Sequence, residues 1–400
     1  MGDIAAKIAR HVRDIPKSGI RDFFEIVQSM DDVISLGIGE PDFATPWHIR
    51  EAAIYSLERS RTGYTSNLGA PRLRRAIADY VERRQGLSYD PKSEVLVAVG
   101  VSEALDIALR ALVEDGDEVL YHEPCYVSYN PSIQLARGVP VGIPTRPEDG
   151  FALDPAALEA RVSPRTKALV LNFPTNPTGA TLDRDSLERI AAVCRERDLI
   201  VLADDIYSEL VYDGLRHVSI AAVEGMRERT VYFNGVSKAY AMTGFRVGFA
   251  CAPEALIDAM MKVHQYSILC APVTSQEASI EALEHGDLSV SQMRREYEQR
   301  RNYIVSACNE IGLPCWMPQG SFYAFVDIRP SGLGSREFAM RLLASKKVAA
   351  VPGTAFGPSG EGFLRCSYAT SLDKIKSAVA LIGEFVGELR SGAEPAAAAV

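Results

Sequence analysis

Short apolar stretches alternate with longer amphipathic ones through the middle of the chain. Four of the apolar stretches are rich in β-branched residues and predict buried strands: EVLVAVG (94–100), TKALVLNF (166–173), LIVLADDIY (199–207) and TVYFNG (230–235). Helical patterns separate them, including one that opens at Ser102 and one over 183–198. Strands alternating with helices predict an α/β fold with a mostly parallel sheet covered on both faces.

The pattern changes after about residue 285. A long charged helix is predicted over 289–312, ended by Gly312 and Pro314, and short strands and helices follow it. We therefore predict a large domain followed by a smaller α+β domain. The expected divisions are an N-terminal segment that belongs to the small domain (1–45), the large ligand-binding domain (46–285), the small C-terminal domain (286–391) and a disordered tail (392–400).

Composition narrows the classes of partner. The 400 residues carry a formal net charge of -9, a sign that argues against nucleic acid or an anionic membrane as partner. Seven cysteines, odd in number and never spaced as CxxC, predict neither a disulfide framework nor a zinc site, and we expect no metal. The N-terminus lacks the apolar core of a signal peptide and no long apolar run is present, so we expect a cytoplasmic protein.

Two cations stand out in an apolar stretch. Lys238 and Arg246 are the only charged residues in VYFNGVSKAYAMTGFRVGFACAP (231–253), and no acidic residue in it can pair with them. A charge in such surroundings is costly unless it has a partner. Asp204 follows the apolar IVLA, so it is predicted to be a buried carboxylate that needs a cationic or hydrogen-bonding partner.

Two further strand ends carry polar residues. Gly100 ends a predicted strand and starts GVSEAL, which resembles a phosphate cradle but is also compatible with an ordinary helix start. The stretch NFPTNPTG (172–179) is compatible with a rigid turn. Pyridoxal phosphate would satisfy the whole set, because it offers an aldehyde for an amine, a phosphate for a guanidinium and a ring nitrogen for an acid.

The ordered motifs of the chain resemble those of one family. They run over nearly the whole chain: SLGIGEPDFATP, YTSNLGAPRLRRAIA, GVSEAL, EPCYVSY, NFPTNPTGAT, LADDIYSELVY, SKAYAMTGFRVGF, GSFYAF, VPGTAFG and GFLRCSYA. This series resembles the class I/II pyridoxal-phosphate aminotransferases of fold type I, in the aspartate aminotransferase superfamily. The resemblance implies a large pyridoxal-phosphate-binding domain and a smaller α+β domain.

The resemblance also implies roles around the cofactor ring. Lys238 would form the internal aldimine and then move a proton between the amino acid and the cofactor. Asp204, rather than Asp205, would keep the pyridine nitrogen protonated. Tyr207 and Asn176 would hydrogen-bond the ring hydroxyl. The ring would stack on an aromatic residue, Tyr126.

For the phosphate, the resemblance implies Arg246 and the backbone N–H groups of Val101 and Ser102. Many relatives carry a serine three places before the lysine, where this chain has Gly235, and Ser237 is the candidate for a replacement donor. We expect this departure to weaken cofactor binding only modestly.

The resemblance extends to the substrate and to a second subunit. Arg365 would bind the substrate carboxylate through a two-pronged fork, with Gly39 and Asn176 close by. Tyr64 would reach the phosphate of the neighbouring subunit, which implies a homodimer. The implied substrates are an amino acid and a 2-oxo acid, in a ping-pong reaction.

The side-chain specificity stays open at this level. Ser102 stands where dedicated aspartate enzymes often place a lysine, which favours an aromatic or broad-specificity enzyme using 2-oxoglutarate. The segment 18–27 is either a cover over the site or an ordinary amphipathic helix. Alternatives are an aspartate- or diaminopimelate-type aminotransferase and a C–S β-lyase. A non-catalytic regulator would need an added DNA-binding domain, and GIGEPD lacks the last glycine of a nicotinamide-binding motif.

Overall fold

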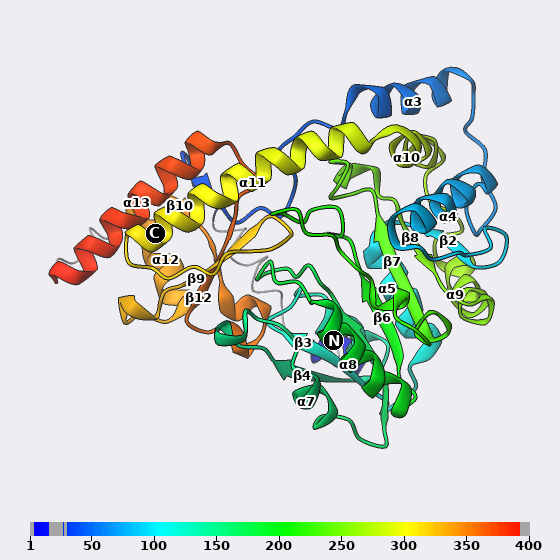
Figure 1. Ribbon diagram of the computed structural model, residues 1–400, viewed down its shortest axis with the longest axis horizontal. Coiled ribbons are helices and arrows are strands. Elements are labelled where there is room, and N and C mark those ends of the chain that lie inside the picture. The colour runs from blue at the N-terminus through cyan, green and yellow to red at the C-terminus, as the bar shows by residue number, and fades with distance from the viewer. Residues whose placement is uncertain (1–3, 16–26, 28–29, 393–400) are drawn as a thin grey trace.

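The computed structural model describes residues 4–15, 27 and 30–392 (Figure 1). Its strands are β1 Ile34–Ser35, β2 Val95–Ala98, β3 Glu118–Glu123, β4 Val139–Pro144, β5 Thr166–Leu171, β6 Ile200–Asp204, β7 Thr230–Gly235, β8 Gly248–Cys251, β9 Tyr323–Asp327, β10 Val348–Ala349, β11 Val351–Pro352 and β12 Phe363–Ser367. Its α-helices are α1 Arg10–Arg13, α3 Trp47–Glu58, α4 Pro71–Gln85, α5 Gly100–Leu112, α6 Tyr129–Leu135, α7 Pro155–Glu159, α8 Arg184–Glu196, α9 Glu254–Ser267, α10 Val273–His285, α11 Asp287–Glu310, α12 Ser335–Lys346 and α13 Leu372–Ser391.

A seven-stranded sheet forms the centre of the molecule, in the order β2-β8-β7-β6-β5-β3-β4. Neighbouring strands are parallel except at β8, which is antiparallel to both β2 and β7. The predicted α/β fold with a mostly parallel sheet is thus confirmed.

Two predicted boundaries were wrong by a few residues. Strand β6 ends at Asp204, because the chain then turns and the N–H of Ser208 donates to the carbonyl of Asp205 at 2.9 Å. Helix α5 begins at Gly100 rather than at Ser102, directly after the strand, because the backbone turns into the helix at Gly100 itself, where φ is +79°. As a result, Asp204 is the last residue of its strand, and the first N–H groups of α5 follow directly after β2 at the edge of the sheet.

Alternate side chains of the central strands pack against helices on opposite faces. Leu202 and Val170 share a core with the buried side of α5, whereas Val201 and Leu169 share one with the buried side of α8. This alternation follows from the two-residue repeat of a strand. It leaves the ends of the strands as the place where polar groups gather.

The C-terminal part of the chain forms a second cluster of elements. An antiparallel sheet in the order β11-β12-β9 packs with α11, α12 and α13, and the long helix α11 runs from α10 to the side of α13 (Figure 1). Strand β1, near the N-terminus, pairs in parallel with β10 in this cluster. The predicted long charged helix is confirmed as α11, while the exact division into domains stays a prediction.

A pair of glycines brings three backbone segments into contact at the edge of the sheet. Gly235 of β7 pairs with Gly248 of β8, and a Cβ at Gly235 would lie 2.9 Å from the carbonyl oxygen of Val247. A Cβ at Gly248 would lie 2.4 Å from the backbone nitrogen of Val101. A serine at position 235 therefore has no room in this chain.

Two predicted segments near the ends of the chain fall largely outside the described residues. Residues 18–26 of the segment 18–27, which is either a cover or an ordinary helix, and residues 393–400 of the expected tail 392–400 lie outside the described residues. Within the described ranges, no helix combines the length and the apolar character needed to cross a membrane.

We expect Gly235→Ala to lower the free energy of unfolding by about 1–3 kcal/mol, because the new methyl group would meet backbone atoms that cannot move aside cheaply. Differential scanning calorimetry of the purified protein measures the change. Gly387→Ala in α13 is the matched control: its Cβ would meet no atom within 4 Å, so it should stabilise by about 0.5–1 kcal/mol. Equal effects of the two substitutions would contradict the crowding at Gly235.

Candidate active site

The predicted site residues come together at one edge of the seven-stranded sheet. The carboxyl ends of β2, β5, β6 and β7 all lie at this edge, because these strands run in the same direction. Strand β8 runs in the opposite direction, so its first residue lies at the same edge. Arg246, two residues before β8, is therefore brought to the carboxyl ends of its neighbours.

The start of α5 and Arg246 form an anion cradle. The N–H groups of Val101 and Ser102 belong to the first turn of α5, where backbone donors have no partner within the helix. A Cβ at Gly100 would lie 2.5 Å from Nη2 of Arg246, so only glycine lets the guanidinium lie against this turn. Sequence reasoning treated Arg246 as a charge in apolar surroundings, but its side chain is exposed, and its Nη1 donates to the carbonyl of Thr243 at 3.0 Å.

The Lys238 amine lies next to the segment that follows β1. Its Nζ donates to the carbonyl of Gly39 at 2.8 Å and lies 5.8 Å from the centre of the Phe322 ring. Burial lowers the pKa of this amine to about 8. The charges of Arg365 and Arg246 act in the same direction, and those of Glu40 and Asp204 oppose it. A larger fraction of the amine is therefore neutral near pH 7 than for a free lysine.

Asp204 ends β6 as a buried carboxylate, 6% exposed. Its Oδ2 accepts a hydrogen bond from the hydroxyl of Tyr129 at 2.8 Å, and its Oδ1 accepts one from the N–H of Ile206 at 3.3 Å. Burial raises the pKa of Asp204 to about 6, although both hydrogen bonds act against the rise. The neighbouring Asp205 is differently placed, with its Oδ2 3.0 Å from Nε2 of His217.

Arg365 is a buried guanidinium surrounded by neutral groups. Its Nη1 donates to Oδ1 of Asn176 at 3.1 Å and its Nη2 donates to the carbonyl of Gly37 at 2.6 Å, while Nε has no hydrogen-bond partner in the part of the chain that the structure describes. The group lies 4.5 Å from the centre of the Tyr323 ring. Among residues 4–15, 27 and 30–392, no carboxylate forms an ion pair with it. A buried cation without an anion is a ready site for a carboxylate.

Tyr207 and Gly39 close the site around Tyr323. The hydroxyl groups of Tyr207 and Tyr323 lie 3.0 Å apart. A Cβ at Gly39 would lie 2.6 Å from Oη of Tyr323, so glycine is needed there for the two segments to meet. The Gly39 carbonyl is also the acceptor for Lys238, so one backbone segment touches both the amine and the aromatic wall.

The other predicted residues are spread around this centre. Tyr126 is half-buried and meets Tyr129 edge to face, with ring centres 5.7 Å apart. Ser237 is buried, whereas Tyr64 is 86% exposed on the single chain. The structure thus gathers the predicted set except for Tyr64, whose side chain is exposed to solvent on the single chain.

Three functional candidates escaped sequence reasoning, although each lies in a recognised motif. Tyr129 is the last residue of EPCYVSY and holds Asp204. Asn172 begins NFPTNPTG, and its side-chain amide donates to the carbonyl of Asp204 at 2.7 Å. Tyr323 in GSFYAF contacts both Tyr207 and Arg365. Their membership of these motifs was the signal that the sequence offered for them.

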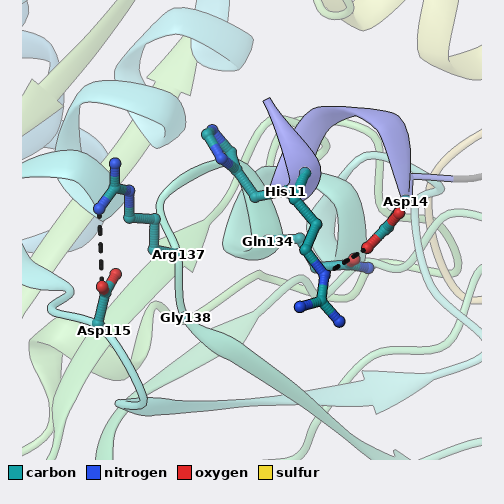
Figure 2. Close-up of a pocket in the computed structure, with 7 residues that line it drawn as sticks. His11, Asp14, Asp115, Gln134, Arg137 and Gly138 are labelled. Atoms are coloured by element: carbon teal, nitrogen blue, oxygen red, sulfur yellow. Dashed lines mark hydrogen bonds and ion pairs between the residues drawn. The ribbon is translucent and has the colours of Figure 1, made fainter. Parts of the chain in front are cut away.

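A cavity of about 500 Å³ lies elsewhere, between the N-terminal helix α1 and the loop that precedes β4 (Figure 2). It is lined by Arg10, His11, Asp14, Asp115, Gln134, Arg137 and Gly138. Its two arginines are each near an aspartate, Arg10 with Asp14 at 3.4 Å and Arg137 with Asp115 at 3.6 Å. Each arginine of this cavity is therefore paired with an aspartate of the same cavity. This differs from the site at the carboxyl ends of the strands, called the strand-end site below, where Arg365 has neutral partners.

Comparison with known proteins identifies the family of the chain. The family model "Aminotransferase class I and II" matches residues 31–382. The chain is 45% identical to an aspartate aminotransferase of Pyrococcus abyssi (strain GE5 / Orsay) and 44% identical to aromatic-amino-acid aminotransferase 2 of Thermococcus litoralis (strain ATCC 51850 / DSM 5473 / JCM 8560 / NS-C), with 90% of this chain and 94% of each relative covered.

A solved structure shows the same arrangement of elements. The aromatic aminotransferase of Pyrococcus horikoshii OT3 matches with a TM-score of 0.88 and 43% identity, over 93% of this chain and 99% of that one. The resemblance between the sequence motifs and the aminotransferases is thus confirmed over nearly the whole chain. The chain belongs to the class I and II aminotransferase family and is an aminotransferase of fold type I.

Proposed function

We propose that the strand-end site binds pyridoxal phosphate. Its parts fit the cofactor: the cradle of Val101, Ser102 and Arg246 suits a phosphate dianion, and Asp204 suits a protonated ring nitrogen. The remaining contacts would come from Asn176 and Tyr207 at the ring hydroxyl, Tyr126 on the ring face, and Ser237 and Lys238 near the phosphate and the aldehyde. When bound, the cofactor supplies the aldehyde and the electron-withdrawing ring.

The observation that carries the proposal is that two basic side chains of the site, Arg365 and Lys238, are held by neutral groups. The guanidinium of Arg365 is 4% exposed with only neutral acceptors, and the amine of Lys238 is held nearby by the Gly39 carbonyl. The guanidinium of Arg365 suits the α-carboxylate of an amino acid, and the amine of Lys238, in its neutral form, suits a proton acceptor at the adjoining carbon. Arg365 would grip the α-carboxylate with Asn176 and Gly39 beside it, and Lys238 would take the proton from Cα and pass it to the aldehyde-derived carbon of the cofactor.

We further propose an aromatic or broad-specificity amino donor, with 2-oxoglutarate as acceptor, in a ping-pong reaction. Similar proteins are named both aspartate and aromatic aminotransferases, which supports an enzyme of one of these types. Arg365 and Arg246 are the cations whose charges lower the pKa of Lys238 most strongly. Both are already assigned, to the α-carboxylate and the phosphate, so neither is left to bind the side-chain carboxylate of an aspartate donor. An aspartate- or diaminopimelate-type enzyme and a C–S β-lyase are the alternatives that the test below separates.

We also propose a homodimer in which Tyr64 reaches the phosphate of the neighbouring subunit. Tyr64 and Tyr266 are 86% and 88% exposed, and large apolar side chains of α3, among them Trp47 and Leu57, are exposed as well. Exposed aromatic side chains are enriched where a protein contacts another protein. All seven cysteines are free thiols, which suits a reducing compartment such as the cytoplasm.

The purified protein should show a visible cofactor band that bleaches with amino donors, strongest with aromatic ones, and returns with 2-oxoglutarate. Lys238→Ala should abolish the band and turnover, because it removes the amine that lies at the site beside Gly39. Lys262→Ala is the matched control, since that lysine is exposed on α9. A lyase would instead release pyruvate and ammonia from cystathionine, and turnover by Lys238→Ala would contradict the proposed mechanism.

The rate at which cofactor-free protein captures pyridoxal phosphate should depend on pH. Only the neutral amine of Lys238 can attack the aldehyde, and its pKa of about 8 lies below that of a free lysine. The rate should therefore rise with pH and level off above about pH 8. Stopped-flow absorbance measures it, and a rise that continues to pH 10 would show that the amine is not depressed.

Arg365→Lys should raise KM for every amino donor by a similar factor of about 10–100. The substitution keeps the charge but loses the planar fork that binds a carboxylate at two points. Steady-state kinetics with phenylalanine, aspartate and alanine test the prediction, with the exposed Arg329→Lys as control. A loss confined to one donor would move Arg365 from the α-carboxylate to the side-chain pocket.

Mixed dimers test the shared site. Lys238→Ala and Tyr64→Ala proteins should each bind the cofactor poorly or turn over slowly alone. After the two variants are unfolded and refolded together, about half of the dimers should be mixed, and one of the two sites in each mixed dimer contains both residues. About a quarter of the wild-type activity should therefore return. Failure to regain activity, with dimers present by light scattering, would show that Tyr64 serves its own subunit.

A further inference from the structure

Two buried residues hold the start of α5 from behind. Oε1 of Glu103 lies 2.6 Å from Nδ1 of His264, and Oε2 of Glu103 accepts a hydrogen bond from the N–H of Val99 at 2.5 Å. Glu103 belongs to α5 and His264 to α9, and these helices pack against each other. The His264 side chain is fully buried and that of Glu103 is 11% exposed.

The hydrogen-bond roles in this pair follow from chemistry. With Glu103 as a carboxylate, which can only accept, Nδ1 of His264 is the donor of this hydrogen bond. The same carboxylate accepts from Val99, the residue that precedes Gly100, so one side chain joins α9 to the turn between β2 and α5. This contact is similar to a capping box, in which an acidic side chain of the first turn reaches back to the backbone before the helix.

The carboxylate of Glu103 is unfavourable at this position in two respects. It lies within a turn of the N–H groups of Val101 and Ser102, where its negative charge opposes the binding of an anion. Its burial is also unfavourable without partners. Helix formation alone does not require it, because a neutral side chain of good helix propensity would serve in α5.

The turn that Glu103 holds has almost no free space. Gly100 has φ +79°, Gly248 leaves only 2.4 Å between an added Cβ and the nitrogen of Val101, and the Arg246 guanidinium lies against Gly100. A small rotation of the turn would therefore change the direction of the cradle N–H groups relative to Arg246. A misalignment of about 1 Å between such donors and the ligand is enough to weaken binding.

We propose that Glu103 and His264 are a positioning pair for the phosphate: by fixing the N–H of Val99 they keep the first N–H groups of α5 aimed at the anion beside Arg246. The inference rests on the proposed function of the site. Neither residue touches the cofactor, and both act through the backbone of the turn.

The test compares a ligand with the phosphate and one without it. Cofactor-free Glu103→Ala protein should bind pyridoxal phosphate about 3- to 30-fold more weakly than wild type, the range expected for the loss of a cap. It should bind pyridoxal, which lacks the phosphate, as well as wild type does. Absorbance titrations measure both constants. Inorganic phosphate alone should also raise Tm of the variant less than that of wild type.

Two further variants separate positioning from general damage. Glu103→Gln keeps an acceptor for the Val99 N–H and should recover most of the phosphate-dependent affinity. Asp106→Ala removes a carboxylate from the same helix, paired there with Arg110 on the exposed side, and should change neither constant. His264→Gln offers the same comparison if Glu103→Ala does not fold.

Unchanged affinity of Glu103→Ala for pyridoxal phosphate would overturn the proposal, and so would equal losses for pyridoxal and pyridoxal phosphate. Wild-type protein that fails to bind pyridoxal phosphate would instead overturn the proposed function of the whole site.

Discussion

The direction of the central strands is the constraint on which the rest of this molecule depends. Parallel strands deliver their carboxyl ends to one edge, and the reversal of β8 delivers its amino end to the same place. Residues that are more than a hundred positions apart, such as Val101 and Lys238, thereby enter one site. The close backbone contact between Gly235, Gly248 and the start of α5 then leaves this edge little freedom to deform.

The charges at this edge are arranged for ligands rather than for stability. Arg365 has neutral partners, Arg246 lies exposed beside an open helix start, and Lys238 is held by a backbone carbonyl. Burial disfavours the charged forms of Lys238 and Asp204, which moves both of their pKa values toward neutrality. Groups with pKa values near neutrality can exchange protons readily at physiological pH.

The fold and most of the candidate site could be predicted from sequence, because the apolar pattern marks strands and the motifs mark their ends. Lys238, Asp204 and Arg365 are recognisable since each lies in a motif of its own. Tyr129 was not recognised because its partner Asp204 is 75 positions away, and only strand order brings them together. The exposure of Arg246 also escaped sequence reasoning, since an apolar neighbourhood along the chain does not fix which way a side chain points.

The pairing of β1 with β10 has a consequence for the order in which the protein is built. Residues 34–35 find their strand partner only at residues 348–349, and Gly37 meets Arg365 only after β12 has formed. A ribosome must therefore release most of the chain before the segment that carries Gly37 and Gly39 can settle. The contact between Gly37 and Arg365, where the proposed function puts the substrate carboxylate, therefore forms well after the central sheet can form.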